Sequence, residues 1–455
     1  MPAFWSGKKT PRASPATGRS YWQRHTQTKA RVPKNEERTG SANHPDVVLI
    51  GGGFAGLMTA IRLAEMEPAA DILLLEANFV GFGASGRNAG LLSPLAAPVW
   101  LVSSNSNPEH AWALKHLNQR TQAVAKWLAT NVPSSEAAAA ILRIESTGRL
   151  TAAALPKIAA TLDKSDIQHE VVAATTVDQG PSGDRPGARK VALEVPSNWI
   201  NPYRCVVALS QHAQSLGVRI KENCVVAAVR DASDGVELVL ASGTTLRTKK
   251  AIVCTNAYSG SIDLPQSLRA KVVYNFMVST PPLTSEQTAH LPAENTFVVE
   301  LNRANAYYRK YAGRLIFGGI DKFSKSGEDD FDVPPDVLAG LEGHLEDSFP
   351  KASMKVSEAW GGRFHMTYTD LPQIERTGAN GSIILNVGYG GTGVALTLVL
   401  SRIAAALATS RGITDPDDQR LFAAINSTRI PILSGARFGL GVAASALASL
   451  LRRKP

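Results

Sequence analysis

A short glycine-rich segment, VLIGGGFAGL at residues 48–57, constrains the fold of this chain more than any other part of its sequence. The preceding run DVVLI (46–50) is typical of a strand buried on both faces. AGLMTAIRLAEM (55–66) has apolar residues at helical spacing, and DILLLEA (71–77) predicts a second buried strand. Strand, turn, helix and strand within about thirty residues predict a βαβ unit.

The glycines of this segment have the spacing Gly51-x-Gly53-x-x-Gly56. The first allows a tight turn, the second lets the backbone approach a pyrophosphate, and the third allows close packing of helix on sheet. Glu76 ends the second strand, twenty residues after Gly56, where a carboxylate that binds ribose hydroxyls is expected. The context favours a dinucleotide site over glycines that serve only a turn. The acid disfavours NADP and leaves NAD and FAD open.

The positive charge of the chain lies at its two ends. Of the net charge of +9, residues 1–38 contribute +7 and the last four residues +3, so the body between them is close to neutral. A basic stripe across a folded face is therefore not expected, and neither is a nucleic-acid partner. Three scattered cysteines and nine dispersed histidines predict no disulfide framework and no metal site, and a reducing compartment fits them.

Both terminal segments leave alternatives open. Residues 1–35 contain no acid, as in organelle transit peptides, but four prolines favour a flexible or surface-bound arm. Residues 432–451 approach the length of a membrane span, about 20 residues. Arg437 and several glycines and serines favour a packed C-terminal helix over a membrane anchor. We expect a cytoplasmic protein, with an organelle or peripheral membrane contact as alternatives.

The rest of the chain predicts further helices and strands. The expected helices cover 108–130, 203–217 and 393–410, a surface loop covers 178–190, and one hairpin turns at Asp234-Gly235. Extended segments are expected at 272–280, 296–301 and 305–320, the last with a turn at Ala312-Gly313. Dinucleotide-binding elements thus occur near both ends of the chain, with mixed α+β material between them. This order indicates an interrupted domain.

Two further glycine-rich segments favour FAD over NAD. VGFGASGRNAGLLSP (80–94) is dense in small residues, which let backbone lie against a flat or anionic ligand. NVGYGGTGVALTLVLSRIAAAL (386–407) places a glycine-rich turn at the start of a helix. Such a helix start stabilises negative charge on a reduced flavin, whereas an NAD dehydrogenase has no need of a second one near its C-terminus.

These segments resemble those of the D-amino-acid oxidase superfamily of flavoproteins. Within it, the chain is most similar to the branch of γ-glutamylputrescine oxidase and related amine-oxidising flavoproteins. Five blocks carry the resemblance, which extends over about residues 20–410: SYWQRHT (20–26), ASGRNAG (84–90), IVCTNAY (252–258), YYRKYAGRLIFGG (307–319) and WGGRFHMTYTDLPQIER (360–376).

The resemblance implies an α/β fold with a discontinuous Rossmann-type FAD-binding domain and an inserted α+β substrate domain built on an antiparallel sheet. The expected parts are a basic N-terminal arm (1–44), an FAD-binding domain (45–100, 195–270 and 359–412), a substrate domain (101–194 and 271–358) and a C-terminal tail or helix (413–455).

It also implies which residues bind FAD: Gly51, Gly53, Phe54, Ala55, Gly56, Glu76, Ala77, Gly83, Ala84, Ser85, Arg87, Asn88, Gly90, Val226, Thr255, Asn256, Gly390, Gly391, Thr392, Gly393 and Val394. The chain departs from the family pattern at Glu375, where relatives have glycine. Positions that attach flavin covalently in some relatives hold no suitable nucleophile here, with His365 as an outside possibility. We therefore expect non-covalent FAD.

The implied reaction is oxidation of a C–N bond in an amine or amino acid. The amine must be neutral, its α-C–H must point at flavin N5, and water must be excluded; hydride then leaves, the imine hydrolyses, and oxygen or another acceptor takes the electrons. The predicted substrate contacts are Tyr307, Tyr308, Arg309, Arg363, His365 and Tyr274. The tyrosines can equally be sheet residues, the arginines structural, and the histidine a core residue.

An amine is favoured over an α-amino acid. Amino-acid dehydrogenases of the superfamily often have G-L-R-P in the return segment, and an arginine there clamps the substrate carboxylate. This chain reads GGRFH, so Arg363 stands one place earlier, which in a strand is the opposite face. Two alternatives stay open: a membrane-associated D-amino-acid-type dehydrogenase that passes electrons to quinone through 432–451, and a flavin-binding protein without turnover.

Overall fold

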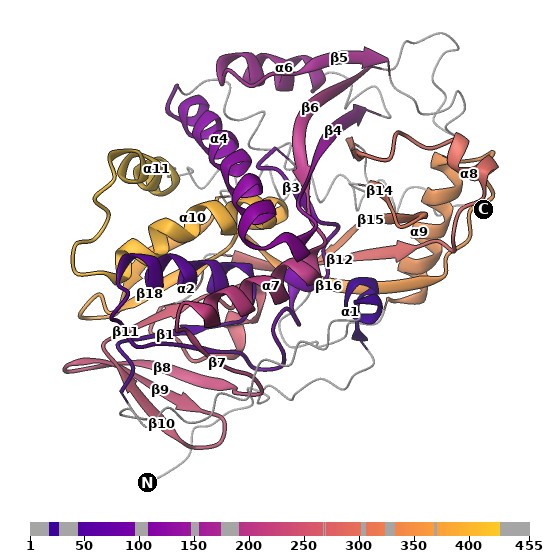
Figure 1. Cartoon of the computed structure of the whole chain (residues 1–455). Coiled ribbons are helices and arrows are strands. Elements are labelled where there is room, and N and C mark those ends of the chain that lie inside the picture. Colours follow the sequence, from indigo (N-terminus) through magenta and orange to yellow (C-terminus); the bar gives the residue numbers. More distant parts are fainter. Residues whose placement is uncertain are drawn as a thin grey trace, which may run out of the picture.

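The computed structural model describes residues 18–26, 44–95, 108–146, 154–173, 191–266, 268, 270–301, 306–323, 333–367 and 371–427. Its six-stranded sheet has the order β17-β18-β11-β1-β2-β7 (Figure 1). The strands are β1 (Val47–Ile50), β2 (Ile72–Leu75), β7 (Arg219–Lys221), β11 (Lys250–Val253), β17 (Gln373–Thr377) and β18 (Ile383–Val387). Neighbouring strands are parallel, except that β17 is antiparallel to β18.

Both faces of this sheet are covered, which explains its continuous apolar strands. Val47 and Leu49 pack in a core that includes α2 (Phe54–Met66), α7 (Pro202–Ser215) and α10 (Gly393–Ala408). Val48 and Ile50 face the opposite way, into a core shared with a three-stranded sheet. That sheet contains β8 (Val226–Ala232), β9 (Gly235–Leu240) and β10 (Thr245–Thr248).

A nine-stranded sheet forms the second layer and rises to the upper right of Figure 1. Its order is β16-β12-β15-β14-β13-β4-β6-β3, with β5 paired to β6. The strands are β3 (Leu91–Leu92), β4 (Ala138–Ser146), β5 (Glu170–Ala173), β6 (Val191–Trp199), β12 (Ala270–Ser279), β13 (Thr296–Leu301), β14 (Tyr307–Tyr311), β15 (Arg314–Phe323) and β16 (Glu358–Thr367). The expected antiparallel pairing holds throughout, except that β4 and β13 are parallel.

The remaining helices lie around the two sheets. The α-helices are α1 (Tyr21–His25), α4 (Pro108–Asn131), α6 (Leu155–Lys164), α8 (Ser285–Ala289), α9 (Pro335–Ser348) and α11 (Pro416–Ser427). The short 3-10 turns are η2 (Ala84–Gly86), η4 (Pro133–Ser135), η5 (Asn256–Ser261) and η6 (Gly390–Thr392). In Figure 1, α2, α7 and α10 lie against the six-stranded sheet, and α9 lies against the nine-stranded sheet.

The predicted elements are confirmed with small shifts of their ends. The four predicted helices correspond to α2, α4, α7 and α10, and the turn at Ala312-Gly313 joins β14 to β15. The hairpin predicted at Asp234-Gly235 is present, with Gly235 as the first residue of β9. The predicted loop 178–190 and the segment 432–451 lie outside the described residues.

Within the described residues, one helical stretch, Gly390–Ala408, is long and apolar enough to cross a membrane by length and composition. It has a mean hydropathy of 1.6, and 78% of it is buried inside the protein. Packing of α10 in the core with α2 and the six-stranded sheet therefore accounts for its apolar composition.

The chain crosses from one sheet to the other within the segment predicted as the last part of the FAD-binding domain. β16 hydrogen-bonds to β12 in the nine-stranded sheet, and β17 then joins the six-stranded sheet. The two sheets are thus connected directly at β16. The domain boundaries expected from the sequence stay a prediction.

Candidate functional site

Four groups of predicted cofactor residues follow the carboxyl ends of neighbouring parallel strands. Gly51–Gly56 follow β1, Glu76 and Ala77 follow β2, Thr255 and Asn256 follow β11, and Gly390–Val394 follow β18. β1 lies between β2, the next strand along the chain, and the much later β11. This is a topological switch point, the place where open α/β sheets bind ligands.

The first glycine turn admits no side chain at its three motif positions. A Cβ on Gly51, whose φ is +110°, would lie 2.9 Å from the carbonyl oxygen of Cys254. A Cβ on Gly53 would lie 2.8 Å from Ser85 Oγ, and one on Gly56 would lie 1.9 Å from the carbonyl oxygen of Gly51. The backbone of α2 therefore approaches the sheet as closely as the sequence predicted.

The N-terminus of α2 offers hydrogen-bond donors at this edge. The Leu57 N–H bonds the carbonyl of Gly53 at 3.0 Å, so the preceding N–H groups have no helical partner. That of Phe54 donates to Ser85 Oγ at 2.9 Å. The N–H groups of Ala55 and Gly56 follow at the positive end of the helix, where phosphate is stabilised.

Glu76 is held beside the glycine turn by the backbone. Its two carboxylate oxygens accept hydrogen bonds from the N–H of Gly52 at 2.7 Å and of Asn78 at 2.9 Å. Its carbonyl accepts from Cys224 N–H at 2.8 Å, which brings the start of β8, at Val226, close to it. Burial, the largest cause, raises the pKa of the Glu76 carboxyl. The fixed position suits a carboxylate that binds ribose hydroxyls.

The loop between β2 and β3 is fixed by its own side chains. Asn88 Nδ2 donates to the carbonyls of Ala84 and Ser85 at 3.0 and 3.1 Å, and Asn88 Oδ1 accepts from Gly90 N–H at 2.8 Å. Gly90 has a φ of +82° and no space for a Cβ, which would lie 2.2 Å from the carbonyl oxygen of Ile200. A Cβ on Gly83 would meet the ring of Tyr258 at 3.1 Å.

Arg87 fastens this loop to the nine-stranded sheet. Its Nε donates to the carbonyl of Phe82 at 2.7 Å, and its Nη1 to the carbonyl of Gly361 at 3.0 Å. Trp360 Nε1 donates in return to the carbonyl of Arg87 at 2.9 Å. Burial lowers the pKa of Arg87 to about 10. Its guanidinium therefore links a carbonyl of its own loop to that of Gly361, which is 274 residues from Arg87 in the sequence.

The C-terminal glycine turn meets the same edge. The Gly388 N–H donates to Asn256 Oδ1 at 3.0 Å, and Asn386 Nδ2 donates to Thr59 Oγ1 on α2 at 3.1 Å. Tyr389 forms an isolated bridge with Met366 of β16. The end of β18 and the turn that follows it thus contact three parts of the protein: helix α2, the loop after β11 and the nine-stranded sheet.

The start of α10 has features of a ligand-binding helix terminus. Gly390 has a φ of +57°, and a Cβ on Gly391 would meet nothing within 4 Å. The N-cap residue Thr392 makes no side-chain cap, and its buried Oγ1 has no hydrogen-bond partner in the described part of the chain. A buried hydroxyl normally has a partner, so this atom points to a bound group.

The residues fit FAD. The first glycine turn and the N-terminus of α2 suit the pyrophosphate, Glu76 suits the ribose, and the helix start at Thr392 suits the flavin end. Together they lie along one edge of the six-stranded sheet.

The predicted substrate contacts do not all lie together. Side chains alternate between the faces of a strand. Tyr307 packs toward the core that contains Met277, Phe297 and Trp360, and Arg309 shares its face. Tyr274 lies on the opposite face, in the cluster beneath α9 that also contains Tyr308. Arg363 is paired directly with Tyr274 across β12 and β16, and His365 with Val272, so both share the face of Tyr274.

Tyr307 takes part in a polar chain on the first face. Its hydroxyl donates to Asn275 Oδ1 at 2.5 Å, and Asn275 Nδ2 donates to Asp321 Oδ1 at 2.8 Å. A β-bulge sets this contact, because Asn275 stands opposite both Ile320 and Asp321. Ile320 has a φ of +60°, a strained value for a β-branched residue. Bulges of this kind redirect side chains and are common beside active sites.

Arg309 is enclosed by aromatic rings. Its guanidinium carbon lies 4.4 Å from the ring centre of Trp199, 5.2 Å from that of Tyr311 and 5.5 Å from that of Trp22. Nη1 donates to the carbonyl of Ile200 at 3.3 Å, and the side chain is only 2% exposed. Burial lowers its pKa to about 10. These contacts favour an anchoring role.

Arg363 and His365 are also buried. The guanidinium carbon of Arg363 lies 3.9 Å from the ring centre of Tyr258. His365 Nδ1 has no hydrogen-bond partner among the described residues, and burial, aided by Arg363, lowers the pKa of His365 to about 4. Three residues of these contacts were not predicted from the sequence: Tyr258, Asn275 and Asp321. The family block IVCTNAY contains the first of these, whereas nothing local marked the other two.

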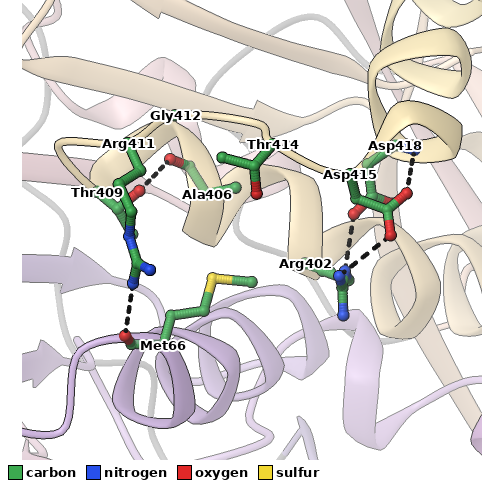
Figure 2. A pocket seen from close by; sticks show the side chains of 9 residues that line it. All are labelled: Met66, Arg402, Ala406, Thr409, Arg411, Gly412, Thr414, Asp415 and Asp418. Atoms are coloured by element: carbon green, nitrogen blue, oxygen red, sulfur yellow. Dashed lines mark hydrogen bonds and ion pairs between the residues drawn. The ribbon is translucent and has the colours of Figure 1, made fainter.

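A separate cavity of about 180 Å³ lies where α2 and α10 end, away from these residues (Figure 2). Arg411 donates to the carbonyl of Met66 at 3.3 Å, and Arg402 Nε donates to Asp418 at 2.7 Å. Arg402 also lies 3.4 Å from Asp415. Arg402 thus pairs with two acids of the lining, and Arg411 pairs with Glu67 beside it, which indicates a structural role.

Known proteins resemble this chain in sequence and in fold. A sequence model of the family described as "DAO: FAD dependent oxidoreductase" matches residues 46–407. Gamma-glutamylputrescine oxidoreductase of Escherichia coli is 27% identical over 382 residues, which cover 80% of this chain and 83% of that protein. A probable oxidoreductase, OrdL, of Rhizobium meliloti is 24% identical over 379 residues, with the same coverage.

Solved structures with a similar fold include glycine oxidase from Geobacillus kaustophilus. It superposes with a TM-score of 0.66 at 19% identity and covers 82% of this chain and 96% of its own. L-proline dehydrogenase from P. horikoshii has a TM-score of 0.66 at 14% identity and covers 84% of this chain and 98% of its own. These likenesses confirm the predicted fold class.

Proposed function

Because the chain belongs to the DAO family of FAD-dependent oxidoreductases, we propose that it oxidises a C–N bond of an amine. The resemblance found in the sequence is confirmed, and with it FAD as the cofactor. The observation that carries the proposal is the meeting of three glycine-rich segments at one edge of the six-stranded sheet, beside β16. We propose that FAD is held there without a covalent bond and that the enzyme works in the cytoplasm.

A bound FAD would supply the two-electron acceptor for the substrate's α-C–H, and the resulting imine would be hydrolysed by water. The chain's own residues have to bind the neutral amine, orient its α-C–H and exclude water. We assign substrate binding to the face of the nine-stranded sheet that carries Tyr307. That face adjoins the loop between β2 and β3, which we call the FAD loop. A Cβ on Gly362 would contact Arg87 Cβ in this loop at 3.4 Å.

Tyr307 is the best-supported contact for the amine. Its hydroxyl proton is donated to Asn275, so its oxygen lone pairs can accept an N–H of the substrate. Burial, with the nearby charge of Asp321, raises the pKa of Tyr307, so the phenol stays neutral at neutral pH. Asp321 adds negative potential behind Asn275, which favours a basic substrate over an anionic one.

An amine is preferred over an α-amino acid because of where the return-strand arginine lies. An α-amino acid needs a guanidinium on the substrate face to pair with its carboxylate. By strand register Arg363 is on the opposite face, where its guanidinium lies over the ring of Tyr258, which abuts Gly83, and the half-buried Phe364 stands on the face of Tyr307. This arrangement supports the sequence-based preference for an amine.

The test is an anaerobic screen with the FAD-loaded protein. Polyamines, γ-glutamyl amines, N-methyl amino acids and D-amino acids are mixed with it, and loss of the oxidised flavin absorbance is recorded. Bleaching by amines is expected, and the name of the Escherichia coli relative makes γ-glutamylputrescine a first choice. Bleaching by D-amino acids alone would contradict the amine preference, and no bleaching by any of them would favour a binding protein without turnover.

A second experiment identifies the electron acceptor. The amine-reduced protein is exposed to air or, without oxygen, to a soluble quinone. Rapid reoxidation in air is expected of an oxidase. Reoxidation by quinone alone, together with partition into membranes, would favour the membrane-associated dehydrogenase.

A further inference from the structure

The short helix α1 lies inside the protein, although it is separated from β1 by more than twenty residues of sequence. Ser20, Tyr21, Trp22 and Gln23 are 0–5% exposed. Ser20 and Gln23 form a capping box, in which each side chain bonds the backbone N–H of the other. A five-residue helix cannot be stable alone, so its position depends on the contacts it makes.

On one side, α1 holds the carbonyls of the FAD loop. Gln23 Nε2 donates to the carbonyls of Gly81 at 2.8 Å and Phe82 at 3.2 Å, and Ser20 Oγ donates to that of Gly86 at 2.6 Å. A Cβ on Gly86 would lie 2.1 Å from the carbonyl oxygen of Gly81 and 2.9 Å from Gln23 Nε2. Loop and helix therefore fit together without spare space.

These bonds set the direction of the loop's donors. In a planar trans peptide the carbonyl and the N–H point in opposite directions. The carbonyl of Phe82 points at Gln23, so the N–H of Gly83 points away from α1. Gly83 directly precedes η2, whose Ser85 bonds the first N–H of α2. The helix thus fixes the orientation of the loop that the family motif assigns to FAD.

On the other side, α1 contacts the nine-stranded sheet (Figure 1). The ring of Trp22 lies 4.8 Å from that of Tyr311 and faces Arg309, and the ring of Tyr21 stacks on that of Trp360 at 6.3 Å. At the surface, Arg24 and His25 pair with Glu358 of β16. The sheet therefore provides the rigid support against which α1 holds the loop.

We propose that α1 is a positioning element for FAD, and that docking of residues 20–25 and binding of FAD stabilise each other. Gln23 is the central positioning residue, because among the residues of α1 it bonds two loop carbonyls with one side chain. FAD orders the loop, the loop completes the binding site for α1, and α1 in turn keeps the loop in its FAD-binding form. The proposal rests on FAD binding within the proposed function.

The experiment measures FAD affinity, not turnover. FAD is titrated into apo-protein, and the dissociation constant is taken from the quenching of flavin fluorescence. Gln23→Leu is expected to raise the constant about tenfold and Ser20→Ala about threefold, the scale of one or two lost hydrogen bonds. Gln287→Leu is the matched control: Gln287 has the same capping-box position in the short helix α8, and its Nε2 donates to the carbonyl of Ala352, so we expect a change of less than about twofold.

Limited proteolysis of the wild type gives an independent measurement. Trypsin cleaves after Arg24 only when α1 leaves its site, so FAD is expected to slow this cleavage about tenfold if the equilibria are coupled. Equal cleavage rates with and without FAD, or equal FAD affinity in all variants, would overturn the role of α1. A wild type that takes up no FAD would overturn the proposed function as well.

Discussion

The side-chain oxygen of Asn256 accepts a hydrogen bond from the backbone N–H of Gly388 at 3.0 Å. The two residues are 132 positions apart and follow neighbouring parallel strands, β11 and β18. Asn256 has a φ of +44°, a left-handed conformation that asparagine tolerates better than most residues. This contact links the loop after β11 to the C-terminal glycine turn.

Replacing Asn256 with Ala is expected to weaken FAD binding about tenfold and to lower the free energy of unfolding by about 1–3 kcal/mol. The hydrogen bond to Gly388 is lost, and alanine is strained at positive φ. Asn256→Gly is the matched control, since it removes the bond but accepts the backbone conformation. FAD titration and urea unfolding of both variants measure the two effects. Equal stability of the two variants would show that backbone strain contributes nothing.

Glu76→Gln is expected to raise the FAD dissociation constant about tenfold, because a charge-assisted hydrogen bond to ribose becomes a neutral one. The amide oxygen can accept from only one of the two N–H groups that the carboxylate bonds, those of Gly52 and Asn78, so part of the support of the turn is lost as well. Titration with FAD measures the change, and circular dichroism of the apo-protein checks the fold. Unchanged affinity would remove Glu76 from the ribose site.

The same substitution makes a pH-dependent prediction for the apo-protein. Burial raises the pKa of Glu76 above its ordinary value of 4.5, so the folded state holds this proton more tightly than the unfolded chain. The resulting stabilisation is present below pH 4.5 and is lost as the pH rises through the raised value. The free energy of unfolding of the wild type, minus that of Glu76→Gln, should therefore fall as the pH rises from 4.5 through the raised pKa of Glu76. Urea unfolding at a series of pH values measures it, and a rise would contradict the prediction.

Local sequence was sufficient to predict the two glycine-rich turns and the helices that the proposed FAD site uses. The glycine turn at Gly51 and the helix start at Gly393 are each defined within about twenty residues, by periodicity and by positions that exclude side chains. The substrate half depends on contacts between distant segments. The aromatic cage of Arg309 brings together Trp22, Trp199 and Tyr311, which no spacing rule connects.

Strand register was the second limit on prediction from the sequence. The sequence predicted that Arg363 stands one place from the family's arginine position, and in the structure Arg363 and its neighbour Phe364 lie on opposite faces of β16. It could not predict which face adjoins the FAD loop, because that depends on how β16 meets Arg87. The bulge that joins Asn275 to Asp321 has no glycine or proline at its centre to mark it, only Ile320 in a strained conformation.

Arg309→Ala is expected to lower the free energy of unfolding by about 2–4 kcal/mol, because it leaves a cavity among three aromatic rings and removes their cation–π contacts. The Michaelis constant for the amine should change less than about threefold, since the guanidinium is enclosed and only 2% exposed. Arg309→Lys keeps the charge but not the planar contact, so its free energy of unfolding should lie between those of the wild type and Arg309→Ala. A large rise in the Michaelis constant with unchanged stability would instead support the substrate contact predicted from the sequence.

Tyr307 and Tyr308 are neighbours in β14 on opposite faces, so they form a matched pair. Tyr307→Phe removes the hydroxyl that donates to Asn275 and is expected to lower kcat/KM for the amine about 10- to 100-fold, while FAD affinity stays the same. Tyr308→Phe removes a hydroxyl from the cluster beneath α9, and should leave kcat/KM within about twofold.

Steady-state kinetics, with FAD content and thermal unfolding as controls, separate a substrate role from a structural one. If Tyr307 only supports the strand, its variant will lose stability without a selective loss of kcat/KM. If both variants lose kcat/KM equally, the assignment of the substrate face is wrong. A selective loss in Tyr307→Phe, partly reversed by smaller amines that do not need this contact, would identify its hydroxyl as a group that binds the substrate.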